Sequence, residues 1–410
     1  MKKIILISFA IMSFVNYSNA QSGWFQQNSN FDNTLFSVTF LNAETGICVG
    51  VFGKILRTSD KGVSWDSISS PTTNELLSVC FSDSNNILAS GSNRTIIKSV
   101  NCGLDWYEIT DISDGYNLTH IQFIDFYTGY IASESGVILK STDSGESWFD
   151  LDHPEPFAQA FNSLFFLDAN TGYVVGTPVY NPVLKTTNGG LNWTRQGNFL
   201  LGSLSSVSFV NSDTGLVYGT GGISKTTNGG LNWNLISVVA TSSGDLSLIN
   251  DQIAYGVDDN GYIVKTTNGG INWMQQMSGT TSHLSGVYFI NEQTGYIVGA
   301  NGTILKTTNG GTVGINTVNQ NVPDDFYLFQ NFPNPFNPST HIKFQMPKSN
   351  YVRLIVYDLS GKEIMTLYEG ELQPGEYEVD FDGSNLSSGT YIYKIEAGDF
   401  VETKKMVLLR

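Results

Sequence analysis

Carboxylates on the segments between the predicted strands are the groups of this chain best placed to do chemistry. Two carboxyl groups on opposite sides of a glycosidic bond can cleave it, one as the acid and the other as the base or nucleophile. The candidates are Asp111, Asp114, Glu134, Glu155, Asp258 and Asp259. A chain with 37 acidic residues carries carboxylates on most surface segments, and no two of the six stand out as a pair. We therefore expect no catalytic residue.

Arginine, histidine and cysteine give no stronger candidate. A hydrolase that clamps the carboxylate of an acidic sugar needs three arginines, and residues 21–314 contain only Arg57, Arg94 and Arg195. Histidines are scattered, and His120 replaces a small residue found at matching points elsewhere, which favours a packing role. The three cysteines, Cys48, Cys80 and Cys102, lack metal-ligand spacing, although a bridge between the first two stays open. No cofactor or metal site is predicted.

A short pattern, Ser/Thr-x-Asp/Asn-x-Gly-x-x-Trp, occurs seven times between Thr58 and Val313, and only the seventh copy lacks its tryptophan. Its acidic or amide members are Asp60, Asn101, Asp143, Asn188, Asn228, Asn268 and Asn309. Its tryptophans are Trp65, Trp106, Trp148, Trp193, Trp233 and Trp273, separated by 41, 42, 45, 40 and 40 residues. Each repeat also holds three short segments of alternating apolar residues. A repeat of about 40 residues with four β segments is typical of a propeller blade.

The boxes themselves are predicted to be structural. Their Asn-Gly pairs supply the positive φ of a tight hairpin turn, and the Asp or Asn can accept hydrogen bonds from the turn's own backbone. The tryptophan then packs between neighbouring blades. A basic residue precedes each box: Arg57, Lys98, Lys140, Lys185, Lys225, Lys265 and Lys306. These seven could form a ring for an anionic partner, but we favour stems that cover apolar surface and heads that reach water or a carbonyl.

The seventh tryptophan is found near the other end of the chain. The letters WFQQ, starting at Trp24, match WMQQ, starting at Trp273, the strand that follows the sixth box. We therefore expect the N-terminal strand to complete the last blade. Such closure removes an unpaired sheet edge, which would otherwise be an aggregation hazard. The predicted fold is all-β: a seven-bladed β-propeller closed by its N-terminal strand, plus a small C-terminal β-sandwich.

The ends of the chain differ from the repeats. Residues 1–20 have two lysines, an apolar run of about 12 residues and a small-x-small site, which together indicate a signal peptide. The propeller is expected over 21–314, a linker over 315–325 and the sandwich over 326–410. The mature chain shows no transmembrane candidate. A net charge of −16 argues against nucleic acid, because phosphate binding requires clustered Lys and Arg.

The boxes resemble the Asp-box (BNR) repeats of sialidases, xyloglucanases and sortilin. With TGYIVG strands and TTNGGLNW boxes, the set of seven is most similar to the propellers of the photosystem II assembly-factor family. The resemblance covers about residues 24–314. It implies the propeller fold, while function depends on sites added to that fold.

The C-terminal stretch resembles the type A sorting domain of the type IX secretion system. The resemblance rests on QNFPNPFNPST, VYDLSGKEI, SSGTYIYKI and the terminal KKMVLLR. The motif residues are Pro333, Asn334, Pro335, Phe336, Asn337, Pro338, Gly361, Gly389, Lys404 and Lys405. It implies that the secretion machinery is a partner through residues 326–410. It also implies passage through the periplasm to the outside, and a sorting domain that is usually removed near the linker.

Ligand binding is expected on the loops at the propeller's mouth. The candidates are Phe52, Tyr116, Phe157, Tyr180, Phe199, Asp258 and Asp259, since aromatic faces beside acidic groups suit sugars or extended peptides. The function predicted is non-catalytic binding of an extracellular glycan or protein by a secreted or surface-attached protein. The alternatives are a divergent glycoside hydrolase and a scaffold for a membrane complex, like the photosystem factors. The sorting tail argues against the second.

Overall fold

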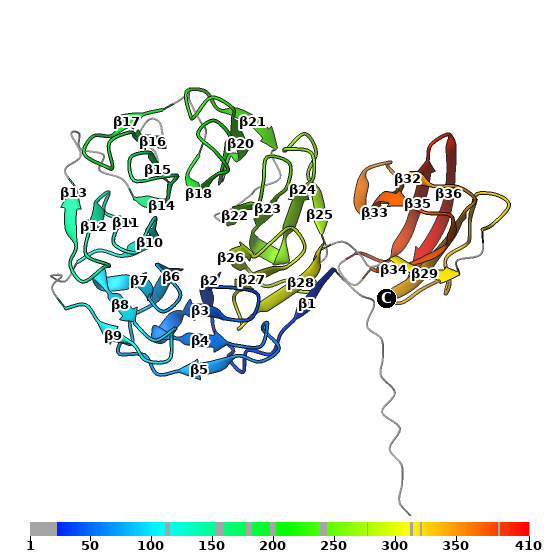
Figure 1. Cartoon of the computed structure of the whole chain (residues 1–410). Coiled ribbons are helices and arrows are strands. Elements are labelled where there is room, and N and C mark those ends of the chain that lie inside the picture. Colours follow the sequence, from blue (N-terminus) through cyan, green and yellow to red (C-terminus); the bar gives the residue numbers. More distant parts are fainter. Residues whose placement is uncertain are drawn as a thin grey trace, which may run out of the picture.

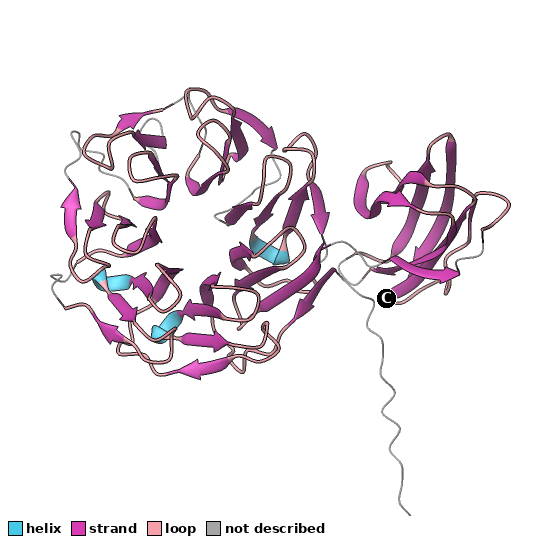
Figure 2. Cartoon of the chain, viewed as in Figure 1, coloured by secondary structure: helices cyan, strands magenta, loops and turns pink. Residues whose placement is uncertain are grey.

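The computed structural model describes residues 23–110, 115–151, 160–177, 183–196, 202–237, 244–276, 278–311, 315–319, 322–383 and 386–409. These residues form nine four-stranded sheets, seven before residue 312 and two after it. Helical structure among them consists of three single turns, η1 (Val51–Gly53), η2 (Ser92–Arg94) and η3 (Asp259–Gly261) (Figure 2). The predicted all-β class is confirmed. Within these ranges, no helix is both long and apolar enough to cross a membrane.

The first seven sheets follow one another along the chain. Sheet 1 contains β2 (Leu35–Phe40), β3 (Gly46–Gly50), β4 (Ile55–Thr58) and β5 (Asp66–Ile68). Sheet 2 contains β6 (Leu76–Phe81), β7 (Ile87–Gly91), β8 (Ile96–Ser99) and β9 (Tyr107–Glu108). Sheet 3 contains β10 (Leu118–Phe123), β11 (Gly129–Ser133), β12 (Ile138–Ser141) and β13 (Phe149–Leu151). Sheet 4 contains β14 (Phe161–Phe166), β15 (Gly172–Gly176), β16 (Val183–Thr186) and β17 (Thr194–Arg195).

The remaining three complete the series. Sheet 5 contains β18 (Leu204–Phe209), β19 (Gly215–Gly219), β20 (Gly222–Thr226) and β21 (Asn234–Ser237). Sheet 6 contains β22 (Asp245–Leu248), β23 (Ala254–Val257), β24 (Ile263–Thr266) and β25 (Met274–Gln276). Sheet 7 contains β26 (Leu284–Phe289), β27 (Gly295–Gly299), β28 (Ile304–Gly311) and, at its outer edge, β1 (Gly23–Gln26). The arrangement is propeller-like, with the first strand of each sheet nearest the middle (Figure 1).

The hydrophobic core lies between neighbouring sheets rather than inside any one of them. Phe40 and Trp65 of sheet 1, for example, share a buried cluster with Tyr296 and Val298 of sheet 7. Because consecutive side chains of a strand point to opposite faces, each sheet contributes to two such clusters. The first strands of sheets 7 and 1, β26 and β2, are in contact, so the last sheet packs against the first.

Antiparallel strands divide the loops between two faces. The turns after each third strand hold the boxes, and we call that side the box face. The turns that join second to third strands, including η1 to η3, lie on the opposite side together with the segments that lead into the next sheet. We call this side the mouth face.

The two C-terminal sheets share one core. The first contains β29 (Ile315–Asn319), β34 (Gly375–Asp382), β31 (Ser339–Met346) and β30 (Tyr327–Leu328). The second contains β33 (Glu363–Leu372), β32 (Asn350–Tyr357), β35 (Gly389–Ala397) and β36 (Phe400–Leu408). Phe344 and Val379 from one pack with Leu354, Tyr393 and Ile395 from the other.

Two details bear on the sequence predictions. The proposed linker 315–325 is wrong in its first half, because 315–319 form β29 and pair with β34, Ile315 opposite Val379. A polar Asn/Thr-rich segment can add to a sheet edge because main-chain hydrogen bonds carry that pairing. Cys48, Cys80 and Cys102 are all free thiols, so the bridge left open does not form.

Candidate functional site

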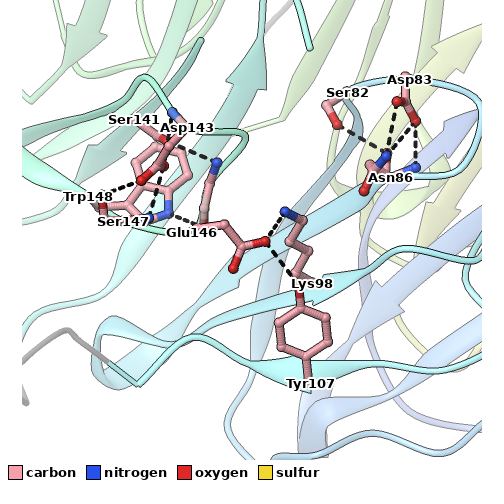
Figure 3. Close-up of polar contacts among 11 residues, drawn as sticks. Ser82, Asp83, Asn86, Lys98, Tyr107, Ser141, Asp143, Glu146, Ser147 and Trp148 are labelled. Atoms are coloured by element: carbon pink, nitrogen blue, oxygen red, sulfur yellow. Dashed lines mark hydrogen bonds and ion pairs between the residues drawn. The ribbon is translucent and has the colours of Figure 1, made fainter. Parts of the chain in front are cut away.

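The box turns are held by their own side chains. In the first six copies the Asp or Asn accepts the N–H of the residue four positions on at 2.9–3.0 Å. The Ser or Thr at the first position donates to the same side chain and accepts a glycine N–H, as Ser141 does with Asp143 and Gly145 (Figure 3). In the seventh copy Thr307 donates to Asn309. Hydrogen bonding to Ser64 lowers the pKa of Asp60, which favours the ionised acceptor.

The box tryptophans pack edge-on against a phenylalanine of the first strand. Trp65, Trp193 and Trp233 meet Phe40, Phe166 and Phe209 with ring centroids 5.9–6.0 Å apart and nearly perpendicular planes. Trp148 meets Phe123 in the same way, and Trp106 and Trp273 lie in apolar clusters. This edge-to-face arrangement suits the ring quadrupoles.

Trp24 takes the same role in sheet 7. Its ring is 1% exposed and lies 5.8 Å from Phe289 at 88°, and its Nε1–H donates to Gln276 Oε1 at 2.8 Å. Strand β1 pairs antiparallel with β28, which belongs to the repeat without a tryptophan. The N-terminal strand therefore supplies this sheet with its outer strand and its indole.

The basic residues before the boxes connect neighbouring sheets. Lys140, Lys185 and Lys225 each donate from Nζ to a glycine carbonyl in the next box, at 2.7–3.0 Å, and Lys265 bonds Gly310 O at 2.9 Å. Lys98 instead pairs with Glu146, which also accepts the hydroxyl of Tyr107 (Figure 3). Burial lowers the pKa of Lys265 to about 8. The heads of these lysines other than Lys98 therefore reach carbonyls, as favoured above.

The mouth face carries the candidate ligand residues in separate places. Phe52 is exposed in η1, and Tyr116 accepts a hydrogen bond from Arg94, whose guanidinium also pairs with Asp150 at 2.8 Å. Asp258 and Asp259 flank the start of η3. Phe157, Tyr180 and Phe199 lie outside the described residues.

Asp258 and Asp259 are part of one polar cluster. Asp258 is buried and accepts the Tyr218 hydroxyl at 3.0 Å and the Asp259 N–H at 2.8 Å. Asp259 bonds His283 Nδ1 at 2.6 Å. Burial and the neighbouring Asp258 charge raise the pKa of Tyr218, which keeps its hydroxyl protonated as a donor. Oxygen and nitrogen atoms of the two aspartates and His283 lie close enough together to hold a metal ion.

Asp258 stands where sheets 1, 2, 4, 5 and 7 have a glycine and sheet 3 has Ser133. At Gly219 an added Cβ would lie 2.0 Å from Ser203 O, and Gly50, Gly91, Gly176 and Gly299 are equally close to the entering chain. In sheet 6 the first strand begins only at Asp245, which pairs with Val257, so Asp258 escapes this contact. The exchange of Gly for Asp was visible in the sequence once the repeats were aligned.

A second acidic residue of sheet 6 was missed. Asp245 takes the inner-strand position of Ser37 and Ser78, whose hydroxyls accept the N–H of Val79 and Ile121 in the next sheet. Asp245 does the same for Val287 at 3.0 Å, and burial raises its pKa. The sequence signal for Asp245 was a charged residue at a repeat position that several other sheets fill with serine.

The other groups considered for catalysis do not converge. Burial lowers the pKa of His120 to about 4, and its Nδ1 is buried without a hydrogen-bond partner. Arg57 donates to Cys102 O on the box face, and Glu134 is engaged by Asn117. Asp111, Asp114, Glu155 and His153 lie outside the described residues.

The C-terminal motif folds as one unit against the last strand. Phe336 is buried, its N–H donates to Val407 O, and Asn334 accepts the Val407 N–H at 2.9 Å. The peptide bonds preceding Pro333, Pro335 and Pro338 are cis, and Asn337 precedes the last of them. Gly361 has a φ of 83° in the turn after β32, and Gly389 begins β35 opposite Leu408. Lys404 pairs with Glu402, and Lys405 O accepts from Asn334.

Comparison with known proteins agrees with this architecture. Residues 330–409 match the secretion system C-terminal sorting domain, a tail that implies export. The chain is similar in structure to YCF48 bound to D1 peptide, with a TM-score of 0.61 and 18% identity over 70% of this chain and 98% of that one. It is also similar to a GH74 xyloglucanase from Xanthomonas campestris, with a TM-score of 0.59 and 12% identity over 78% of this chain and 59% of the enzyme. At these identities the likeness shows the fold alone.

A sequence relative points in the same direction. The chain is 32% identical over 137 residues to the photosystem II assembly lipoprotein Ycf48 of Synechococcus sp. (strain CC9902). That match spans 32% of this chain and only 39% of the relative. The model of the photosynthesis system II assembly factor YCF48 family matches residues 63–156 and 154–288, more than half of the 410 residues. The chain therefore belongs to the YCF48 family of photosynthesis system II assembly factors and carries a secretion-system sorting tail.

Proposed function

We propose that the protein is a non-catalytic binding propeller, exported through the type IX secretion system and active at the cell surface or outside the cell. In this proposal residues 21–314 form a closed seven-bladed propeller, residues 1–20 are a signal peptide, and residues 326–410 are the sorting domain, a small β-sandwich. The box residues are structural, and the ligand is an extracellular glycan or protein held by the mouth face.

The main support for the proposal is that one chain contains both a sorting tail and a propeller of this family. The tail favours a site of action outside the cell rather than at a photosynthetic membrane. The contact between β2 and β26 and the pairing of β1 with β28 support closure of the ring. The solved YCF48 with its D1 peptide supports the idea that a ring of this kind can present a binding face.

A non-catalytic role is favoured by the hydrogen bonds that the candidate carboxylates make within the protein. Asp258 has its two oxygens on Tyr218 and on a backbone N–H, so it is oriented by the protein rather than poised beside an open site. Glycoside hydrolysis needs two carboxyl groups that flank the scissile bond. The xyloglucanase likeness supports the hydrolase as the second candidate, and release of reducing ends from a polysaccharide would select it.

Export is tested by following a tagged chain in a bacterium with this secretion system. The native chain should reach the surface or the medium, and a chain truncated after residue 325 should stay in the periplasm. Lys404→Ala with Lys405→Ala should reduce export, while Lys343→Gln, on the other C-terminal sheet, serves as the matched control. Periplasmic retention of the native chain would contradict the proposal.

A further inference from the structure

The segment that closes the ring copies two other connections, those that lead from sheet 1 to sheet 2 and from sheet 6 to sheet 7. Ser29 is buried and donates to Gly302 O at 2.8 Å, and Gly302 N–H donates to Asn33 O at 2.7 Å. Ser70 and Ser278 take the same place in their connections, each beside a turn glycine (Gly53 and Gly261). The closing segment is therefore fixed in position before any ligand arrives.

The closing segment differs from these two connections in the side chains that it exposes. Phe31 stands where the other two connections have Thr72 and Thr280, and Asp32 stands where they have Thr73 and Thr281. The segment lines an open groove of about 610 Å³ with the turn that holds Asn301. Its walls contribute five carboxamides, from Gln26, Gln27, Asn28, Asn30 and Asn301, and its charged lining residue is Asp32.

Phe52, in the turn η1 of sheet 1, has an unfavourable backbone conformation. Its φ of 59° is left-handed, and the matching turns of sheets 2, 6 and 7 place Asn93, Asn260 and Asn301 there. Asparagine tolerates that region, whereas a bulky aromatic residue at positive φ is a genuine outlier. The Phe52 ring is also 69% exposed, so burial does not compensate for the strain.

The turn that holds Phe52 is tied to the closing segment. Val51 N–H donates to Thr34 O at 3.1 Å, and Lys54 Nζ lies 4.8 Å from the centroid of the Phe31 ring. The exposed ring and the carboxamide groove therefore belong to one region of the mouth face, on either side of the segment 31–34. Strain at an exposed residue is a sign of function when no packing explains it.

We propose that this region binds a neutral oligosaccharide, with the carboxamides and Asp32 bonded to sugar hydroxyls and Phe52 packed against a sugar ring. A carboxamide both donates and accepts, which matches a hydroxyl that does the same. The Asp32 carboxylate in the groove lining disfavours anionic ligands such as acidic sugars or phosphates, and the nearby Lys54 ammonium is already held by Ser67 Oγ at 2.8 Å. A peptide strand would require side-chain pockets along a main-chain edge. Strand β1 is such an edge, but the groove lining beyond it consists mainly of side-chain amides. The inference rests on the proposed binding role and names its ligand class.

Isothermal titration of the purified chain with cellohexaose, xylohexaose, mannohexaose and laminarihexaose tests it, with oligogalacturonate as the anionic comparison. We expect one of the neutral hexaoses to bind and oligogalacturonate not to. Phe52→Asn should weaken binding about tenfold or more while unfolding at the same or a higher temperature, because it relieves the left-handed strain. Phe52→Tyr should retain binding.

Two further variants address the groove itself. Asn28→Asp keeps the oxygen that accepts the Asn30 N–H, but loses the amide donors, and should weaken binding. Thr73→Ala, at the equivalent of Asp32 in the next connection, should leave it unchanged. Binding that survives Phe52→Asn and Asn28→Asp would overturn the assignment to this region, and preferential binding of oligogalacturonate would overturn the ligand class. Silence of all neutral hexaoses, while a tagged chain still captures a surface protein, would refute the glycan inference and leave the proposed binding function standing.

Discussion

Replacing Trp24 with alanine measures how much the N-terminal strand contributes to the stability of sheet 7. The indole is buried, meets Tyr255 and Phe289 edge-on at 6.3 and 5.8 Å, and donates to Gln276. Loss of a buried tryptophan leaves a cavity and costs about 3–5 kcal/mol, which includes edge-to-face contacts of about 1 kcal/mol each. We therefore expect the free energy of unfolding to fall by about 4 kcal/mol.

Urea unfolding followed by tryptophan fluorescence is the suitable assay, because all seven tryptophans precede residue 312 and report on the ring rather than the tail. Trp106→Ala is the matched control, since that indole is 9% exposed and donates to Gly103 O within an internal sheet. An equal decrease in the free energy of unfolding for both variants would mean that β1 is packed as firmly as the strands of the internal sheets. A loss below about 1 kcal/mol for Trp24→Ala, beside a full loss for Trp106→Ala, would refute closure by the N-terminal strand.

Three further substitutions test the repeat. Lys265 has a pKa of about 8 in the folded chain, against 10.5 in the unfolded chain. Between these two pH values the unfolded chain binds more protons than the folded chain, so the free energy of unfolding increases as pH rises. From pH 7.5 to 9.5 the unfolding free energy of the native chain should gain about 2 kcal/mol relative to Lys265→Met, and parallel curves would contradict this. Gly219→Ala should cost about 2–3 kcal/mol in urea unfolding, because its Cβ meets Ser203 O, and a neutral result would show that the chain can yield there. Asp60→Asn should be nearly neutral and Asp60→Ala cost about 1 kcal/mol, since asparagine makes the same turn bonds in other boxes, so equal costs for both would refute that account.

The repeat made much of this fold predictable from sequence. Seven boxes with nearly constant spacing set the strand order, and the match of Trp24 to the box tryptophans located the outer strand of sheet 7. The resemblance to the photosystem assembly-factor propellers and to the sorting tail was confirmed by the family matches. Repeated positions are informative because the same residue type recurs at each of them several times within one chain.

Residues that break the repeat were harder to interpret. Phe52 was chosen for its aromatic ring, but its left-handed φ depends on the turn around it. Asp245 and His283 were missed because their neighbours come from adjacent sheets, which sequence spacing does not reveal. Strand β29 was read as linker since its pairing with β34 joins residues about 60 positions apart.

The departures from the repeat that the structure describes fall mainly on one side of the ring. On the box face, the first six turns keep the same hydrogen bond from the backbone N–H four residues on. Lysines that precede the boxes form contacts between neighbouring sheets. On the mouth face, Phe52, Phe31 and Asp258 replace residues that other repeats use only to turn the chain. A change in a box turn affects two sheets at once, because the turn also accepts a hydrogen bond from the lysine of the preceding sheet. Binding specificity is therefore expected to arise on the mouth face, and substitutions on the box face should change stability before they change binding.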